Sequence, residues 1–456
     1  METDVKLEDL EEEPEAKLID GLVAQRYDRE RKRSAVIGHF LGGGEKVDAA
    51  VIEPRYYGEL LAWALHRYIE VEGWEVVKTV GYRSPQPVYI NVNTGCGECQ
   101  NVLRDGSLFV KKGSDRFAIT IDANLRGYNS VVVTGPARRK KQVHEFANGV
   151  HNLAKEQNFY RGEKLELGRR IRFLNLSDRT WESLVLDTGL KDEIWANTIG
   201  FLANRERLAS YGIPAKRGVL LVGEPGTGKT LVCKALMAKS PGTTCIMANT
   251  YALDADEYIT ELYELAQDLS PSIVFIEDID LIAQNRMEWG YTRGPALLSL
   301  LSVLDGVEEH SEIITVATTN CLEVLDKAIG QRPSRFDRVI ELSRPSLEQR
   351  KVLITALCQK IPLDEDVQAH VARKTENLTP AQLKEVIYSL VIGNGQSNCS
   401  GKSGYLRFSV EEVNSAISKI GRTNKRHLGF AIRDNHFGEL SRAATVIQRE
   451  IETDVR

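Results

Sequence analysis

The chain has 456 residues, of which 42% are hydrophobic and 27% charged, so it is too long for one small domain and too apolar to be disordered throughout. Its 59 Lys and Arg and 64 Asp and Glu residues give a formal net charge of −5, which argues against a dedicated nucleic-acid binder. The 7 cysteines, an odd number, favour reduced thiols in the cytoplasm over a disulfide framework. We also expect no membrane helix and no signal or transit peptide, because the chain lacks a long apolar run and begins with an acidic segment.

The first third of the chain is predicted to hold a charged tail and a separate folded domain. Residues 1–35 combine an acidic block with a mainly basic one and are expected to be flexible. Residues 36–165 are expected to form an α/β domain, in which 55–69 has the spacing of an amphipathic helix and short strand-like segments alternate with turn residues. We predict that residues 166–180 form a linker.

The remainder of the chain is predicted to hold a parallel sheet followed by helices. Strands alternate with helices over residues 181–345, the pattern of a doubly wound parallel sheet. Residues 346–425 have helical periodicity and form a predicted lid, and 426–456 form a predicted C-terminal tail or helix. The expected strands are 218–223, 243–249, 272–278, 312–320 and 338–343.

Residues 223–230, GEPGTGKT, match the phosphate-binding pattern G-x-x-x-x-G-K-[ST] in full. An apolar strand precedes the match and a helical segment follows it, so a chance glycine-rich turn is a weak alternative. The glycines let backbone N–H groups converge on phosphates at a helix N-terminus. Lys229 is expected to reach the β- and γ-phosphates of ATP, and the Thr230 hydroxyl to coordinate Mg²⁺. The predicted nucleotide-binding residues are Gly223, Glu224, Pro225, Gly226, Thr227, Gly228, Lys229, Thr230 and Leu231.

A second motif, IVFIEDID over residues 273–280, is a hydrophobic strand that ends in carboxylates. Downstream of a phosphate-binding loop, this pattern is typical of a Walker B motif. We expect Glu277 to hold Mg²⁺ through water, together with Thr230, and Asp278 to orient or deprotonate the attacking water. Acidic residues at this place also serve as helix N-caps or turn residues.

Two weaker signals follow the Walker B strand. Asn320 ends the next strand, where its amide would reach between the γ-phosphate and the attacking water, although Asn is also a common turn residue. Residues 332–338, RPSRFDR, are either a solvated basic loop or the source of an arginine finger that reaches a neighbouring subunit.

These four motifs, in this order, strongly resemble the AAA family within the AAA+ class, over roughly residues 175–425. The resemblance implies a P-loop NTPase fold with strand order 5-1-4-3-2, a helical lid, and a homo-oligomeric ring, a hexamer or a heptamer. ATP would lie between subunits. The resemblance assigns Asn320 as the sensor 1 residue, and Arg335 and Arg338 as fingers that act in trans.

A closer resemblance points to the branch that contains the mitochondrial inner-membrane translocase of a folded Rieske protein, although this chain lacks that branch's membrane helix. The matching residues are 211–218, Glu277 with Asp278, 318–320 and 378–383. The chain departs from the family at Glu224, where Pro is common, and at Asp278, which is one methylene shorter than the usual Glu. Tyr251 is either a pore-loop aromatic or a packing residue, and Cys96 and Cys99 form a lone CxxC that favours inert thiols.

The predicted function is that of a cytoplasmic, ring-forming ATPase that hydrolyses Mg·ATP to remodel, unfold or translocate a protein client. The client or adaptor would bind residues 36–165, and neither a membrane nor nucleic acid is expected as a partner. Two alternatives remain, a nucleic-acid-directed AAA+ motor or loader and a nucleotide-gated scaffold. The sequence contains no HExxH motif, so a fused zinc protease is not expected.

Overall fold

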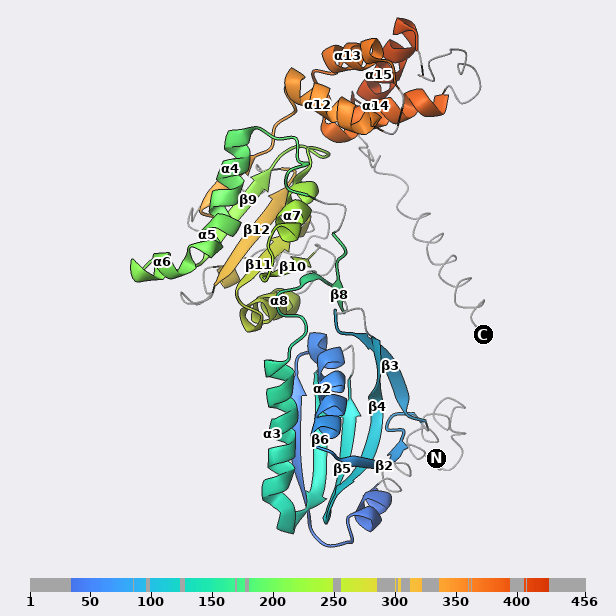
Figure 1. The fold of residues 1–456 in the computed structure, drawn as a ribbon, viewed down its shortest axis with the longest axis vertical. Helices are drawn as coiled ribbons and strands as arrows, with labels where there is room; N and C mark the ends of the chain where they lie inside the picture. The colour runs from blue at the N-terminus through green and yellow to red at the C-terminus, as the bar shows by residue number, and fades with distance from the viewer. Residues whose placement is uncertain are drawn as a thin grey trace, which may run out of the picture.

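The computed structural model describes residues 34–84, 86–95, 99–123, 128–168, 170–176, 180–248, 256–284, 300, 302–304, 312–321, 336–359, 361, 363–393, 406 and 408–425. Most of the predicted charged tail, Cys96, Tyr251, Arg335 and segment 426–456 lie outside these residues. An N-terminal domain, a central domain and a helical lid follow one another along the molecule (Figure 1). Within the described part of the chain, no helix is both long and apolar enough to span a membrane.

The N-terminal domain is an antiparallel sheet with helices α2 and α3 on one face (Figure 1). Its strands pair in the order β1-β6-β5-β4-β2, and β3 pairs with the other half of β4. Helix α3 buries Val143, Phe146 and Val150, which recur at helical spacing and so form one apolar face against the sheet. The elements are β1 (Lys46–Glu53), α2 (Gly58–Val71), β2 (Glu75–Val80), β3 (Val88–Asn93), β4 (Cys99–Lys112), β5 (Asp115–Asp122), β6 (Asn129–Pro136) and α3 (Lys140–Glu156).

The central domain is built on a second sheet, in the order β13-β9-β12-β11-β10-β7-β8. Its pairs are parallel except β7 with β8, and strands β10, β11 and β12 are buried along their whole length because helices cover both faces. The strands are β7 (Lys164–Leu167), β8 (Ile171–Phe173), β9 (Arg217–Val222), β10 (Thr244–Ala248), β11 (Ser272–Ile276), β12 (Ile313–Thr319) and β13 (Arg338–Glu341). Each strand expected between residues 218 and 343 is therefore present.

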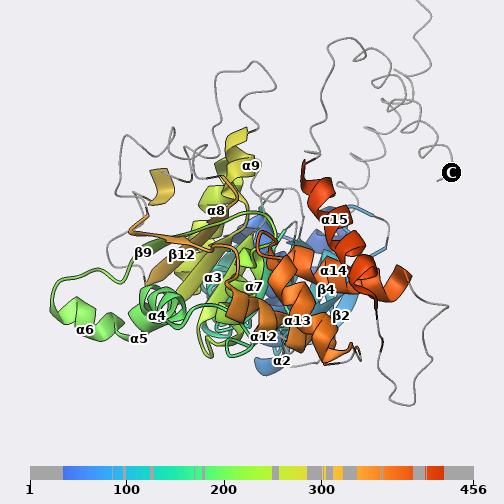
Figure 2. The ribbon, with the colours of Figure 1, turned by 90° about the horizontal axis from the view of Figure 1, so that it is seen from above.

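Helices of the central domain connect these strands and extend beyond them. Helix α7 follows β9, α8 lies between β10 and β11, and α9 follows β11, as parallel strands require crossover connections. Helices α4, α5 and α6 run out to one side of the sheet in both views (Figures 1 and 2). The helices are α4 (Thr188–Asn197), α5 (Ile199–Ala203), α6 (Arg205–Ser210), α7 (Lys229–Ala238), α8 (Asp256–Asp268) and α9 (Ile279–Gln284).

The structure differs from the sequence analysis in residues 164–173, which were divided between the N-terminal domain and the linker. Strand β7 pairs with β10 and strand β8 pairs with β7, so both strands belong to the central sheet. Leu165 and Leu167 alternate with polar residues and are buried, and β7 covers the edge of β10 that would otherwise expose unpaired backbone groups. The run is too short for its period to stand out in the sequence.

The lid packs its helices around a core of its own, separate from the core of the central sheet. Helix α12 begins at a capping box in which Ser346 and Gln349 each accept a hydrogen bond from the other's backbone N–H. The lid helices lie together at one end of the molecule, beyond the central domain (Figure 1). They are α12 (Leu347–Cys358), α13 (Glu365–Lys374), α14 (Pro380–Gly393) and α15 (Val410–Lys425).

Side chains of the N-terminal domain are fixed to helix α8 of the central domain. The Arg55 guanidinium forms an ion pair with Glu261 at 2.5 Å and lies 3.7 Å from the centre of the Tyr258 ring. Tyr57 donates a hydrogen bond to Asp268 at 3.3 Å. A continuous cluster of buried apolar side chains runs from one domain into the other. The two domains are therefore packed together rather than joined by a loose connection.

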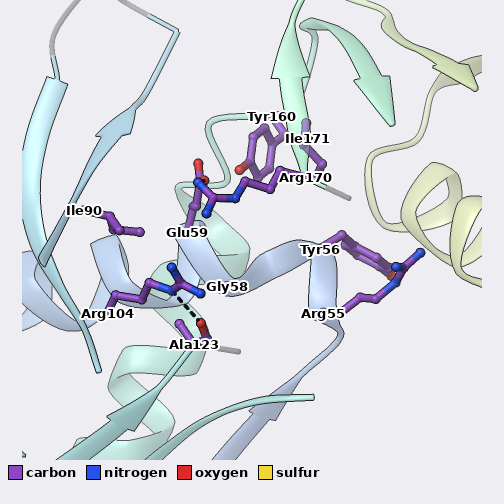
Figure 3. A pocket seen from close by; sticks show the side chains of 10 residues that line it. All are labelled: Arg55, Tyr56, Gly58, Glu59, Ile90, Arg104, Ala123, Tyr160, Arg170 and Ile171. Atoms are coloured by element: carbon purple, nitrogen blue, oxygen red, sulfur yellow. Dashed lines mark hydrogen bonds and ion pairs between the residues drawn. The ribbon is translucent and has the colours of Figure 1, made fainter. Parts of the chain in front are cut away.

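A small cavity lies beside this contact (Figure 3). Glu59 lies between Arg170, which pairs with it at 3.6 Å, and Arg104, which donates a hydrogen bond to the Ala123 carbonyl at 3.0 Å. Burial raises the pKa of Glu59, and the two arginines act in the opposite direction. The cavity has only about 10 Å³ of space, enough for a single water molecule, so it belongs to the packing between the domains.

Candidate functional site

The loop after strand β9 has the geometry of an anion-binding turn. Gly226 and Gly228 have φ angles of 85° and 104°, in the left-handed region that glycine adopts without strain. A Cβ atom on Gly223 would lie 2.6 Å from the Leu342 carbonyl oxygen, so glycine is required there by space. Helix α7 begins at Lys229, and its N-terminal N–H groups face the end of this loop. Backbone sterics thus explain the glycines of the sequence motif.

Lys229 is the central cation of the site and is only 6% exposed. Its ammonium donates hydrogen bonds to the Gly223 carbonyl at 2.6 Å, the Glu224 carbonyl at 3.1 Å and Asn320 Oδ1 at 2.7 Å. Burial lowers the pKa of Lys229, while the nearby carboxylates of Asp278 and Asp280 act in the opposite direction. The ammonium is therefore held by protein oxygens at the point where phosphate oxygens would bind.

The carboxylates at the end of strand β11 join this network. Asp278 Oδ1 accepts a hydrogen bond from Asn320 Nδ2 at 3.0 Å, and the Asp278 backbone N–H donates to Thr318 Oγ1 at 3.0 Å. Asp278 has a φ of 50°, an uncommon conformation for a residue with a side chain and one that recurs at functional sites. Hydrogen bonds thus link Lys229, Asn320 and Asp278 across three neighbouring strand ends.

Glu277 differs from its neighbour in having a carboxylate oxygen without a partner. Its Oε1 atom is buried and accepts no hydrogen bond from any residue that the structure describes, while its backbone N–H donates to the Ala248 carbonyl at 3.2 Å. A buried carboxylate oxygen without a partner is costly unless it binds a cation or a donor that arrives with a ligand.

Asp280 belongs to the site although sequence reasoning assigned it no role. It is 3% exposed, and its Oδ1 atom accepts hydrogen bonds from the Thr319 hydroxyl at 3.0 Å and the Asn320 backbone N–H at 3.2 Å. These bonds fix the end of strand β12, and thereby the position of the Asn320 amide. The signal in the sequence was the third acidic residue of Glu277-Asp278-Ile279-Asp280, which lies two residues beyond Asp278.

We expect Asp280→Ala to lower both the melting temperature and the rate of ATP hydrolysis. The Asn320 backbone N–H loses its acceptor, at a cost of about 1–3 kcal/mol, and the Thr319 hydroxyl keeps only its bond to the Cys321 carbonyl at 3.3 Å. Asp280→Asn keeps an acceptor oxygen at the same place, so its melting temperature and its hydrolysis rate should stay close to those of the wild type. Thermal unfolding and steady-state hydrolysis of the two variants would measure this difference. Equal losses in the alanine and asparagine variants would show that the acceptor does not position Asn320.

Comparison with known families agrees with this geometry. Residues 219–344 match the family described as "ATPase family associated with various cellular activities (AAA)". The chain contains an AAA ATPase domain. The match begins inside strand β9 and continues through the phosphate-binding loop, residues 223–230, which we call the P-loop. It includes strands β10 to β12 and ends at Arg344, three residues after strand β13.

Curated relatives share the AAA domain and differ in their names. A proteasome-activating nucleotidase of Methanosarcina mazei is 36% identical over 197 residues, which are 41% of this chain and 46% of the relative. An ATP-dependent zinc metalloprotease FtsH of Hahella chejuensis is 33% identical over 238 residues, 48% of this chain and 37% of the relative. A cell division cycle protein 48 homolog of Archaeoglobus fulgidus is 36% identical over 190 residues, 40% of this chain and 26% of the relative. The chain thus spans less than half the length of each of these relatives, and the closer resemblance to the Rieske-protein translocase branch stays a prediction.

The AAA domain brings some of the predicted site residues together and leaves others apart. The P-loop, Glu277, Asp278 and Asn320 meet at the carboxyl ends of strands β9, β11 and β12, the usual ligand edge of a parallel sheet. The side chains of Thr230 and Leu231 are exposed in the first turn of α7. The predicted nucleotide contact of Leu231 stays a prediction.

Arg338 begins strand β13 and so lies at the amino end of the strands, whereas the P-loop follows the carboxyl end of the neighbouring strand β9. Arg338 is exposed and pairs with Val219, four residues before Gly223, which corresponds to about 13 Å along the strand. Asp337, in the same motif, accepts a hydrogen bond from the Gly218 backbone N–H at 2.7 Å and so fixes the start of β13 against β9. Arg335 lies outside the described residues.

The donor set of the AAA domain suits Mg·ATP. Mg²⁺ is commonly held by one or two protein oxygens, with phosphates and water supplying its other ligands. The unpartnered Glu277 oxygen and the exposed Thr230 hydroxyl meet this need without a larger cluster. In the described residues, no group of three or more His, Cys, Asp or Glu side chains forms a separate metal site.

Proposed function

We propose that this chain is a ring-forming AAA ATPase that hydrolyses Mg·ATP at subunit interfaces to remodel, unfold or translocate a protein client. The observation that carries the proposal is the hydrogen-bonded set Lys229, Asn320 and Asp278 beside the glycine turns of the P-loop. The order β13-β9-β12-β11-β10 supports an AAA+ module of strand order 5-1-4-3-2, and the separate core of α12 to α15 supports a helical lid. A cytoplasmic location is part of the proposal.

The residues of the site divide the work of hydrolysis. The P-loop N–H groups and Lys229 bind the phosphates, for which Lys229 exchanges its present contacts with Gly223, Glu224 and Asn320. Asp278 takes the proton of the attacking water, and Asn320, already bonded to Asp278, orients that water. Mg²⁺, held through Thr230 and Glu277, would neutralise charge on the β- and γ-phosphates.

The arginines of the RPSRFDR motif complete the site from a neighbouring subunit in this proposal. Arg338 lies at the amino end of strand β13, the end away from its own P-loop, and is exposed, which favours contact with another subunit's nucleotide over its own. We assign Arg335 the same role by its place in the motif. A hexamer is proposed, with a heptamer as the alternative.

A protein client is favoured by the relatives and by charge. One relative is named a proteasome-activating nucleotidase and another a metalloprotease, both names that concern proteins as targets. A formal net charge of −5 does not favour a nucleic-acid track. We assign client or adaptor recognition, predicted for residues 36–165, to the N-terminal domain, which is packed against α8.

Mixing two inactive variants tests the shared site directly. Lys229→Ala should be inactive for lack of phosphate binding, and Arg338→Ala should be inactive for lack of the finger. Mixed rings contain interfaces where an intact P-loop meets an intact Arg338, so the mixture should regain about a quarter of wild-type hydrolysis if subunits assort at random and each interface acts alone. Steady-state hydrolysis of each variant and of the mixture is the measurement.

Several outcomes would contradict the proposal. No recovery on mixing, together with a rate per subunit that is unchanged by dilution, would exclude a site shared between subunits. Hydrolysis stimulated by single-stranded DNA or RNA, with steep salt dependence, would favour the nucleic-acid motor instead. Negligible turnover in the presence of stable ATP binding would favour the nucleotide-gated scaffold.

A further inference from the structure

The P-loop carries a negatively charged side chain, Glu224, close to the place where the phosphates of ATP are proposed to bind. Glu224 is the second residue of the loop, directly after Gly223, and its side chain is 54% exposed. Lys229, whose ammonium contacts the Glu224 carbonyl, is the main cation of the phosphate site. An uncompensated carboxylate on this loop would repel the phosphates of ATP and lower its affinity.

Arg344 compensates this charge with a two-pronged contact. Its Nε atom donates to Glu224 Oε2 at 3.0 Å, and its Nη2 atom donates to Oε1 and Oε2, both at 2.8 Å. This fork geometry is the arrangement that arginine makes with a carboxylate and that lysine cannot reproduce. The two residues are 120 positions apart in the sequence, so the fold alone brings them together.

The backbone around Arg344 is itself held against the base of the P-loop. The Leu342 N–H donates to the Val222 carbonyl at 2.7 Å, just before the loop begins. Arg344 follows two residues later and immediately precedes Pro345 and the N-cap residue of α12, Ser346, so it stands on the connection between the central sheet and the lid. The pair therefore joins the P-loop to the start of the lid connection.

The lid contacts the same part of the P-loop at a second point. The Ala381 N–H, in the first turn of α14, donates to the Gly226 carbonyl at 3.2 Å. A Cβ atom on Gly226 would lie 2.8 Å from the Ala381 Cβ and 2.9 Å from Thr379 Oγ1, so the two chains are in close contact. The outer half of the P-loop, residues 224–226, is thus held between the lid connection and the lid.

We propose that Arg344 is a positioning residue that neutralises Glu224 and fixes the outer half of the P-loop, so that the affinity for ATP depends on this ion pair. The proposal rests on the proposed function, in which the P-loop binds ATP. An exposed ion pair adds little to folding stability, so its effect should appear in nucleotide binding rather than in unfolding. Arg344 need not touch the nucleotide to act in this way.

A double-mutant cycle measures the pair. The dissociation constant of a slowly hydrolysed ATP analogue with Mg²⁺ is determined for the wild type, Arg344→Ala, Glu224→Gln and the double variant. We expect Arg344→Ala to weaken binding about tenfold, because the Glu224 carboxylate then loses both its compensating charge and the fork that holds it and the loop in place. Glu224→Gln should bind at least as well as the wild type, because it removes the repelling carboxylate, and Arg344→Ala should weaken binding much less in the Glu224→Gln background than in the wild type.

A matched control and a conservative variant accompany the cycle. Arg67→Ala removes another exposed arginine ion pair, that with Glu70 at 2.8 Å on α2, and should leave the dissociation constant unchanged. Arg344→Lys keeps the charge and loses the fork, so its binding should lie between those of the wild type and Arg344→Ala. If Arg344→Ala does not fold, Arg344→Lys with and without Glu224→Gln closes the same cycle.

The outcomes separate this proposal from the function on which it rests. If Arg344→Ala weakens binding equally with and without Glu224→Gln, Arg344 acts on the nucleotide by itself and the positioning role is wrong. Unchanged affinity in Arg344→Ala would overturn it as well. If the wild type and Lys229→Ala bind ATP equally poorly, the proposed function fails. Failure of the Arg344 proposal alone would leave ATP binding by the wild type intact, so the two failures can be distinguished.

Discussion

Lys229→Ala should abolish ATP binding, with a fall in affinity of about 100-fold or more and no measurable hydrolysis. The substitution removes the charge-assisted bonds that the ammonium would make to the phosphates. It also leaves the Gly223 and Glu224 carbonyls and Asn320 Oδ1 without the donor that now holds them together. Titration with a fluorescent ATP analogue and a steady-state hydrolysis assay would measure the loss.

A lysine at the other end of the same helix provides the control. Lys239 follows the last residue of α7 and pairs with Glu182 at 2.5 Å, about 15 Å along the helix from Lys229. Lys239→Ala should bind ATP like the wild type. Retention of wild-type affinity in Lys229→Ala would mean that the P-loop is not where ATP binds.

Asp278→Asn should separate binding from hydrolysis, with a rate reduced about 100-fold or more and ATP affinity largely kept. Asparagine has the same size and tolerates the φ of 50° at this position, so the backbone should stay in place. Its amide oxygen can still accept the bond from Asn320 Nδ2 that Asp278 now accepts at 3.0 Å. The charge that would accept a proton from water is what the substitution removes.

Single-turnover hydrolysis and equilibrium binding of Asp278→Asn would test this division. Asp278→Ala is a useful comparison, because alanine in a left-handed conformation costs roughly 1–2 kcal/mol and should also lower the melting temperature. Undiminished turnover in Asp278→Asn would show that Asp278 is not the proton acceptor, and Glu277 would be the first residue to test in its place.

The P-loop and the buried strands were predictable from the sequence, because each is specified by a short continuous stretch of residues. The glycines of residues 223–230 are required by backbone angles and by close approach of Leu342, so their spacing alone defines the turn. Strands such as Ser272–Ile276 are continuous apolar runs because both of their faces are buried. The P-loop NTPase fold followed from these patterns, and the family match agrees with it.

The contacts made by residues far apart in the sequence were not predictable. The bond of Asp280 to Asn320 depends on which strands are neighbours and on how their ends align, and residue types do not carry this information. The pairing of Glu224 with Arg344 has the same origin. Strands β7 and β8 were missed because runs of four and three residues are too short to show a period.

The joint between the N-terminal domain and helix α8 has a mechanical consequence. Arg55 contacts Glu261 and Tyr258, and buried apolar side chains continue across the boundary, so the N-terminal domain is anchored to helix α8 by packing as well as by the chain connection. Helix α8 leads by way of strand β11 to Glu277 and Asp278. A force applied to the N-terminal domain would therefore be transmitted through helix α8 and strand β11 to the carboxylates beside the P-loop.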